Sequence, residues 1–197
     1  MPDQATLDFY EREAPNYTAT STQGQSRHLD NFLSRLNPGA YILELGCGGG
    51  RDASHMIEHG FVVDATDGTQ AMTRKARERF NVPARVMRFD ELEAIDRYDA
   101  IWAHASLLHA ARAELPRFLQ GIYQALHPQG LHFANYKLGD GEGRDKLGRL
   151  TNLPTATWLE ETYSAANFEI LETDRYAGKG CDGTQRDWLA LTVKRND

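Results

Sequence analysis

Short apolar runs alternate with amphipathic segments along most of this chain. The apolar runs predict strands over residues 41–45, 61–66, 85–89, 98–103, 130–137, 168–176 and 186–195. Apolar residues at helical spacing predict helices over residues 3–13, 26–36, 51–59, 69–80, 112–126 and 155–166. A polar stretch over residues 14–25 predicts a flexible connector. Strands that alternate with helices predict a parallel sheet with helices on both faces.

The last two predicted strands follow each other without a helix between them, which favours an antiparallel pair. We therefore expect an α/β fold of Rossmann type, a seven-stranded and mostly parallel sheet with an antiparallel edge strand. A length of 197 residues suits one domain. In that domain we expect residues 1–37 to form an N-terminal helical lid segment and residues 38–197 to form the Rossmann-like core.

Composition narrows the class of protein. The chain is 41% hydrophobic and 25% charged, as globular proteins are. Its net charge of −6 argues against a nucleic acid partner, because such binding depends on neutralised phosphates. No apolar run approaches membrane-spanning length, and the N-terminus is polar and acidic, so we expect a cytoplasmic protein without a membrane partner. Cys47 and Cys181 lack zinc-ligand spacing, so no metal is expected.

A glycine-rich turn, Glu44-Leu45-Gly46-Cys47-Gly48-Gly49-Gly50, follows the first predicted strand of the sheet. Glycine lets a backbone approach a ligand closely, and open α/β sheets bind ligands at the carboxyl ends of their strands. The alternative is a tight strand-to-helix turn without a ligand. Arg51 stands where a dinucleotide fingerprint has its third glycine, which argues against a nicotinamide-dependent reductase.

Asp67 closes the second predicted strand, about 20 residues after the first glycine of the turn. A carboxylate at that place can accept hydrogen bonds from both ribose hydroxyls of an adenosine. The alternative is a helix N-cap, although Thr69 can take that role instead. Asp64 is a rival acid, but it lies inside the strand rather than at its end.

Five segments together resemble the class I S-adenosylmethionine-dependent methyltransferases. They are ELGCGGGRDA at 44–53, VDATDGTQAM at 63–72, RFDEL at 88–92, YDAIWAHASLLH at 98–109 and ALHPQGLHFANYK at 125–137. All five occur in the order and spacing of that family and cover most of residues 40–137. The chain is also similar to the small stand-alone bacterial group that includes tellurite-resistance-type methyltransferases.

This resemblance implies S-adenosyl-L-methionine as the cofactor and methyl transfer to a small-molecule acceptor. The implied cofactor contacts are Tyr17 in the lid; Glu44, Gly46, Cys47 and Gly48 at the methionine part; Asp67 at the ribose; Gly68, Met72, Asp90 and Glu91 at the adenine; and Ala103 through its carbonyl. A silent cofactor-binding sensor or scaffold would share these motifs. The oligomeric state is not indicated.

His109 is the candidate general base, because it follows the fourth strand at the edge where such sheets bind ligands. The alternative is a structural histidine bonded to backbone. His104 and Tyr10 are further candidates for the acceptor pocket. A base is needed only if the acceptor must lose a proton.

Residues 137–149, KLGDGEGRDKLGR, form a charged glycine-rich loop after the fifth strand. Lys137, Arg144 and Arg149 could recognise a small polar or anionic acceptor, since an arginine fork binds oxyanions bidentately. The alternative is a solvated loop whose charges pair internally. GEGRDKLGR resembles a signature of the small bacterial group, but Leu150-Thr151 stands where that group has an aromatic residue.

Overall fold

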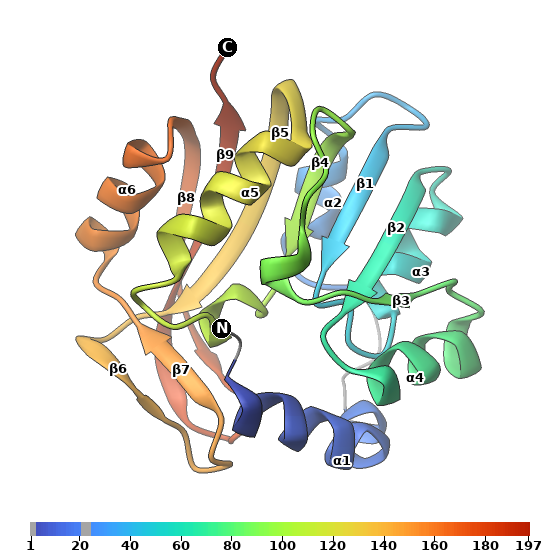
Figure 1. The fold of residues 1–197 in the computed structure, drawn as a ribbon, viewed down its shortest axis with the longest axis vertical. Coiled ribbons are helices and arrows are strands. Elements are labelled where there is room, and N and C mark those ends of the chain that lie inside the picture. Colours follow the sequence, from blue (N-terminus) through green and yellow to red (C-terminus); the bar gives the residue numbers. More distant parts are fainter. Residues whose placement is uncertain (1–2, 21–24) are drawn as a thin grey trace.

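One mixed sheet organises the part of the chain that the computed structural model describes, residues 3–20 and 25–197. Its strand order is β3-β2-β1-β4-β5-β9-β8 (Figure 1). The bounds are β1 (Tyr41–Leu45), β2 (Val62–Asp67), β3 (Arg85–Val86), β4 (Tyr98–Ala103), β5 (Leu126–Lys137), β8 (Phe168–Lys179) and β9 (Gln185–Arg195). Strands β1 to β5 are parallel, whereas β9 pairs antiparallel with both β5 and the edge strand β8. The predicted fold class is confirmed.

Helices cover both faces of the sheet because its central strands bury side chains in both directions. Helices α2 (Leu29–Leu33), α3 (Arg51–Glu58) and α4 (Gln70–Phe80) lie on one face, and α5 (Leu115–Ala125) and α6 (Ala156–Ala165) lie on the other. Successive residues of β4 show the alternation: Ile101 packs in the α5–α6 core, and Trp102 packs in the α2–α3 core. No helix in the described ranges is long and apolar enough to cross a membrane.

The first helix is longer than predicted. Helix α1 (Gln4–Thr20) continues through Pro15, so residues 14–20 of the predicted connector are helical; residues 21–24 lie outside the described part. Pro15 is exposed, while Ala14 is fully buried against Ala71 and Met72 of α4. Local polarity therefore misled the prediction, because helix packing outweighed the missing proline N–H.

Two other segments differ from the predicted elements. The strand expected over residues 85–89 is only Arg85–Val86, and Phe89–Glu91 form a 3-10 turn, η1. The charged loop contains a hairpin, β6 (Gly141–Arg144) and β7 (Leu150–Leu153). The Asp145 carboxylate accepts the backbone N–H groups of Leu147 and Arg149, so it closes the turn between these two strands.

Candidate active site

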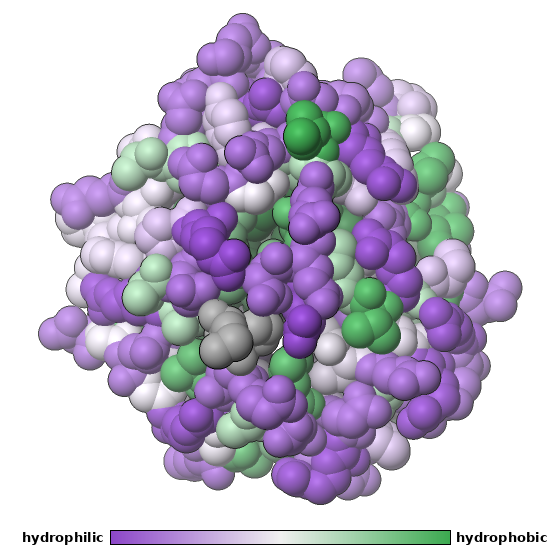
Figure 2. All heavy atoms as spheres, in the orientation of Figure 1, coloured by the Kyte–Doolittle hydropathy of each residue, from purple (hydrophilic) through white to green (hydrophobic). Residues whose placement is uncertain are grey.

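A cavity of about 250 Å³ lies at the carboxyl ends of β1, β2 and β4. Helix α1 runs across these strand ends and contributes residues to the cavity wall (Figure 1). The exterior of this side of the molecule is mainly hydrophilic, with hydrophobic residues visible inside a central hollow (Figure 2). The sheet therefore presents a partly covered pocket at the edge where α/β sheets bind ligands.

The glycine-rich turn forms one wall of this cavity. Gly46 has a φ of +83°, and a Cβ built on it would lie 2.5 Å from the Cβ of Ser106. Ser106, which follows β4, donates its hydroxyl to the Leu45 carbonyl at 2.6 Å. The turn after β1 and the segment after β4 are thus in direct contact, and only glycine allows this approach.

Asp67 lines the cavity and binds Thr69, the N-cap residue of α4, while its binding of a ribose stays a prediction. One carboxylate oxygen accepts the N–H of Gly48 at 3.0 Å, and the other accepts the backbone N–H and hydroxyl of Thr69, each at 3.0 Å. Burial raises the pKa of Asp67. Asp67 lines the cavity, whereas the rival acid Asp64 binds Arg85 and Tyr98 and does not line it. The carboxylate therefore joins the glycine turn to the start of α4 while it faces the cavity.

Glu44 is a buried acid in the cavity wall. Its Oε2 atom has no hydrogen-bond partner among the described residues. Burial, followed by the negative charge of Asp52, raises its pKa well above the usual range. A buried carboxylate oxygen without a partner favours a cationic group in the cavity. This orphaned atom fits the ammonium group of a methionine moiety.

The structure brings most of the implied cofactor residues to the cavity but not all of them. Tyr17, Cys47, Gly68 and Met72 line it. Asp90, Glu91 and Ala103 do not; their neighbours Arg88, Phe89 and His104 do. The Glu91 carboxylate instead accepts the backbone N–H of Arg88 at 2.7 Å.

Several lining residues were missed at the level of sequence. They are Asp3, Thr6 and Leu7 of the N-terminal segment, Arg88 and Phe89, and Ala110, Ala111 and Phe118. The RFDEL segment pointed to the right place, one or two residues away from the side chains that line the cavity. Nothing in the sequence indicated which face of α1 would turn inwards.

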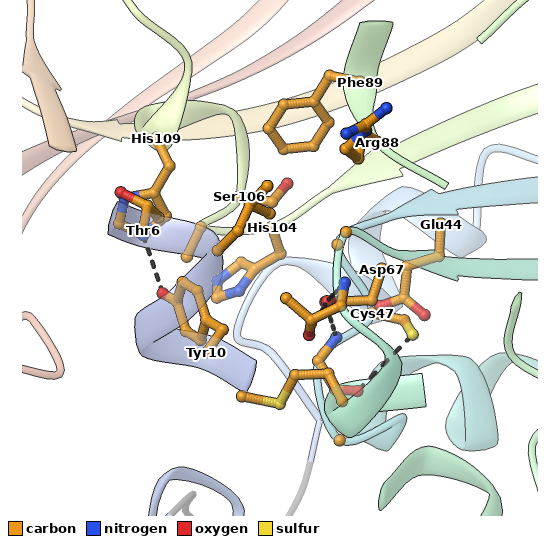
Figure 3. A pocket seen from close by; sticks show the side chains of 18 of the residues that line it. Thr6, Tyr10, Glu44, Cys47, Asp67, Arg88, Phe89, His104, Ser106 and His109 are labelled. Atoms are coloured by element: carbon orange, nitrogen blue, oxygen red, sulfur yellow. Dashed lines mark hydrogen bonds between the residues drawn. The ribbon is translucent and has the colours of Figure 1, made fainter. Parts of the chain in front are cut away.

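His109 and Tyr10 form a hydrogen-bonded pair in the cavity (Figure 3). His109 Nδ1 lies 2.6 Å from the Leu150 carbonyl, which has no proton to give, so Nδ1 carries the proton. Nε2 lies 2.9 Å from the Tyr10 hydroxyl and therefore accepts from it. Burial and the charge of Arg149 lower the pKa of His109 to about 4. Both ring nitrogens are thus occupied within the protein.

His104 projects from the end of β4 into the cavity (Figure 3). Its ring stacks on Trp102, with 5.9 Å between centroids and an 8° interplanar angle. Burial lowers the pKa of His104 to about 4, although the charge of Asp52 opposes this. The ring is therefore a neutral imidazole at pH 7.

The three basic residues of the charged loop lie behind the cavity rather than in its wall. Arg149 is 98% buried and binds Asp145 at 2.6 Å and the Tyr10 hydroxyl at 2.6 Å. Arg144 pairs with Asp3, which does line the cavity, at 2.8 Å. Lys137 is buried with its Nζ 3.9 Å from Asp182. Arg149 thus contacts α1, the element that covers the site, and Arg144 contacts Asp3 directly before that helix.

The charged hairpin shows the internal pairing that was one alternative for this loop, whereas recognition of an acceptor by its arginines stays a prediction. Its charges pair within the protein, as Arg149 does with Asp145. The pairs are not merely solvated, because Arg149 and Arg144 each reach a residue of the cavity wall. The hairpin therefore shapes the site through α1.

Comparisons with known proteins agree on the fold. Residues 42–130 match the methyltransferase domain family. The structure is similar to 1,6-didemethyltoxoflavin-N1-methyltransferase of Burkholderia thailandensis, crystallised with 1,6-didemethyltoxoflavin and S-adenosylhomocysteine. The TM-score is 0.81 at 21% identity, over 98% of this chain and 88% of that one.

Two further structures show the range of this similarity. TehB of Haemophilus influenzae gives a TM-score of 0.71 at 16% identity, over 95% of this chain and 67% of that one. The [4+2]-cyclase SpnF gives a TM-score of 0.76 at 18% identity, over 99% of this chain and 97% of that one. Comparison with curated protein sequences found no significant match. At such identities the structural likeness shows the fold, so the function is argued from the cavity.

Proposed function

We propose that this chain methylates a small-molecule acceptor in the cavity under α1. Its fold is that of class I S-adenosylmethionine-dependent methyltransferases, and residues 42–130 match the methyltransferase domain family. The observation that carries the proposal is a pair of carboxyl groups that line one cavity, the buried Glu44 and the half-buried Asp67. Glu44 in β1 and Asp67 at the end of β2 suit a ligand that carries both a cationic amine and a diol.

The residues present fit S-adenosylmethionine. Glu44 would hold the methionine ammonium, Asp67 would bind the ribose hydroxyls, and the glycine turn would lie along the methionine part. Phe89 and Met72 supply apolar surface for the adenine. When bound, the cofactor supplies a methyl group already activated by its sulfonium charge.

The main contribution of this chain to the reaction is alignment. Holding an acceptor and a methyl group at about 3 Å in line can supply on the order of 7–11 kcal/mol. Helix α1 covers the space above the strand ends, and Tyr10, His104 and His109 line that space. We treat residues 1–37 as the lid segment and the rest of the chain as the core.

Calorimetry with S-adenosylhomocysteine tests the assignment of Asp67. Asp67→Ala is expected to weaken binding by about 1.5–3 kcal/mol, because hydrogen bonds to a charged group are lost. Asp67→Asn keeps the shape of the side chain and guards against misfolding at the start of α4. Asp64→Ala is the matched control, since Asp64 lies on the same strand and pairs outside the cavity. Unchanged affinity in both Asp67 variants would remove the assignment.

A turnover assay distinguishes an active methyltransferase from a protein that only binds the cofactor. The wild-type protein is incubated with S-adenosylmethionine and a panel of thiol, phenol and amine acceptors, and S-adenosylhomocysteine is measured. We expect acceptor-dependent release of S-adenosylhomocysteine with at least one acceptor class. Tight cofactor binding without release on any of them would favour the sensor. Stabilisation by NAD but not by S-adenosylhomocysteine would favour a reductase.

A further inference from the structure

Two histidines line the cavity, and their surroundings differ in one decisive respect. His109 uses Nδ1 for the Leu150 carbonyl and Nε2 for the Tyr10 hydroxyl. His104 makes no hydrogen bond within the described residues, and its ring lies in the cavity wall. A histidine whose nitrogens are both occupied cannot take a proton from a ligand, whereas a ring with a free lone pair can.

We propose that His104, rather than His109, accepts the proton of a hydroxyl acceptor during methyl transfer. This proposal rests on the proposed function. His109 is instead a positioning residue, which holds the Tyr10 hydroxyl and through it the inner face of α1. The acceptor class that follows is a small, uncharged molecule with a hydroxyl group.

Neighbouring rings and the backbone after it hold His104 in place. The ring stacks on Trp102 and lies nearly parallel to Phe133, with an interplanar angle of 11°. The next residue, Ala105, has a φ of +52°, and its N–H donates to the Asn135 side chain at 2.6 Å. Ser106 is bonded to the Leu45 carbonyl. Such a preorganised ring needs little rearrangement to meet an acceptor.

Burial keeps His104 in the neutral form that the reaction needs, although the charge of Asp52 opposes this. Asp52 and Arg51 face it from α3, and His28 faces it from the segment before α2. Asp52 is already engaged by Ser26 and Trp102, so it is not a hydrogen-bonded partner of the ring. With a pKa of about 4, His104 is neutral and does not repel a sulfonium. The hydroxyl becomes strongly acidic as its oxygen bonds to carbon, so a weak base suffices.

The proposed step balances as follows. The acceptor oxygen forms a bond to the methyl carbon, and the carbon–sulfur electron pair stays on sulfur, which becomes a neutral thioether. The oxygen keeps the electrons of its O–H bond, and the proton moves to a ring nitrogen of His104. The imidazolium then releases this proton to water.

The position of His104 leaves one rival role, a contact with the methionine carboxylate of the cofactor. Calorimetry distinguishes the two. His104→Asn is expected to bind S-adenosylhomocysteine within about twofold of wild type if the ring faces the acceptor. A loss of tenfold or more would place the ring on the cofactor and overturn the proposal. His104→Phe keeps the stacking on Trp102, and a retained melting temperature shows that it is folded.

Methyl transfer to phenol and to thiophenol at pH 8 provides the second readout. Thiophenol is already an anion and needs no base. We expect His104→Asn and His104→Phe to slow phenol methylation by about 100-fold or more, the usual effect of a general base, and thiophenol methylation by less than threefold. His127→Asn, at the opposite end of β5 from the site, is the matched control and retains both rates.

The remaining outcomes are also decisive. Equal loss on both acceptors means that the ring only shapes the pocket, and unchanged phenol methylation means that another group takes the proton; either overturns the proposal. Wild-type methylation of thiophenol but not of phenol overturns it as well, while the proposed function stands. A wild type that binds S-adenosylhomocysteine but methylates no acceptor removes the proposed function itself.

NMR spectroscopy tests the proposal without a turnover measurement. In the S-adenosylhomocysteine complex, adding phenol is expected to shift the ring resonances of His104 in NMR spectra and to leave those of His127 in place. Absence of any shift in His104 at saturating phenol would overturn the proposal.

Discussion

At the scale of single residues, the buried Glu44 carboxyl group in the cavity wall lowers the stability of the ligand-free protein. Glu44 Oε2 is buried without a partner, and burial raises the pKa of this carboxyl group. A raised pKa of an acid in the folded state means that ionisation at pH 7 opposes folding. The free protein is therefore less stable at neutral pH than it would be with a neutral side chain at this position.

The Glu44→Gln variant tests whether this carboxyl group lowers the stability of the free protein and strengthens ligand binding. We expect the variant to unfold at a higher denaturant concentration than wild type at pH 7 and to lose most of this advantage at about pH 3.5, below the usual pKa of a glutamate, where Glu44 is mostly protonated in both states. Its affinity for S-adenosylhomocysteine should fall by about 1.5–3 kcal/mol, because the ammonium loses a charged partner. Urea titrations at both pH values and calorimetry measure these effects. A variant that is destabilised at pH 7 and binds normally would contradict both parts.

The sequence predicted correctly which side chains line the cavity where the position of the residue in its own strand decides this. Asp67 and Glu44 lie at the ends of their strands, and both line the cavity. It failed for Arg149, because the hairpin turn that buries this guanidinium against Asp145 depends on long-range contact with α1. The distinction between His104 and His109 also depends on tertiary hydrogen bonds that no local pattern encodes.

At the scale of elements, the β6–β7 hairpin holds α1 over the site. Arg144 pairs with Asp3, the Leu150 N–H donates to the Thr6 hydroxyl at 2.8 Å, and Arg149 donates to Tyr10. The Asp3–Arg144 pair is partly exposed and contributes little, about 0–1 kcal/mol. The contacts of the buried Arg149 dominate.

Limited proteolysis tests this attachment. A protease of broad specificity is expected to cut within residues 14–25, and S-adenosylhomocysteine should slow the cut, because a ligand under α1 favours the closed form. Arg149→Ala should speed the cut in the ligand-free protein. Arg117→Ala, which removes an exposed pair with Glu114 on α5, is the matched control. Cleavage at the same rate with and without ligand would argue against a lid.

The order of elements along the chain was predictable because the strands β1, β2, β4 and β5 each have their own apolar run. The length of α1 was not predictable, since its inward face is defined by tertiary contacts with α4 and with the β6–β7 hairpin. The hairpin within the charged loop was also missed, because its short, mostly exposed strands have no alternating apolar pattern.

At the scale of the whole molecule, buried histidines link stability to pH. His132 lies in the core between the Ile101 carbonyl and the Tyr163 hydroxyl, and burial lowers its pKa to about 4. The pKa values of His104 and His109 are lowered to about the same value. An unfolded chain binds these protons near pH 6.5, so stability is fully present above that pH and is lost as pH falls towards 4.

Each such histidine makes the unfolding free energy fall by at most about 1.4 kcal/mol per pH unit over this window. Urea titrations between pH 7 and pH 4.5 measure the slope. His132→Phe should make it shallower, whatever its effect on stability at pH 7, and His127→Asn serves as the control. An unchanged slope in His132→Phe would show that this histidine is not responsible.

The place of β9 in the sheet has a consequence for the synthesis of the chain. This strand is the last strand of the sheet to be synthesised, yet it lies inside the sheet between β5 and β8. Domains generally fold from the N-terminus during synthesis, but here β8 has no partner strand until residues 185–195 have emerged. The edge of β5 also stays open until then, so a nascent or truncated chain presents an unpaired strand edge that favours aggregation. Completion of the sheet must therefore wait until β9 has been synthesised.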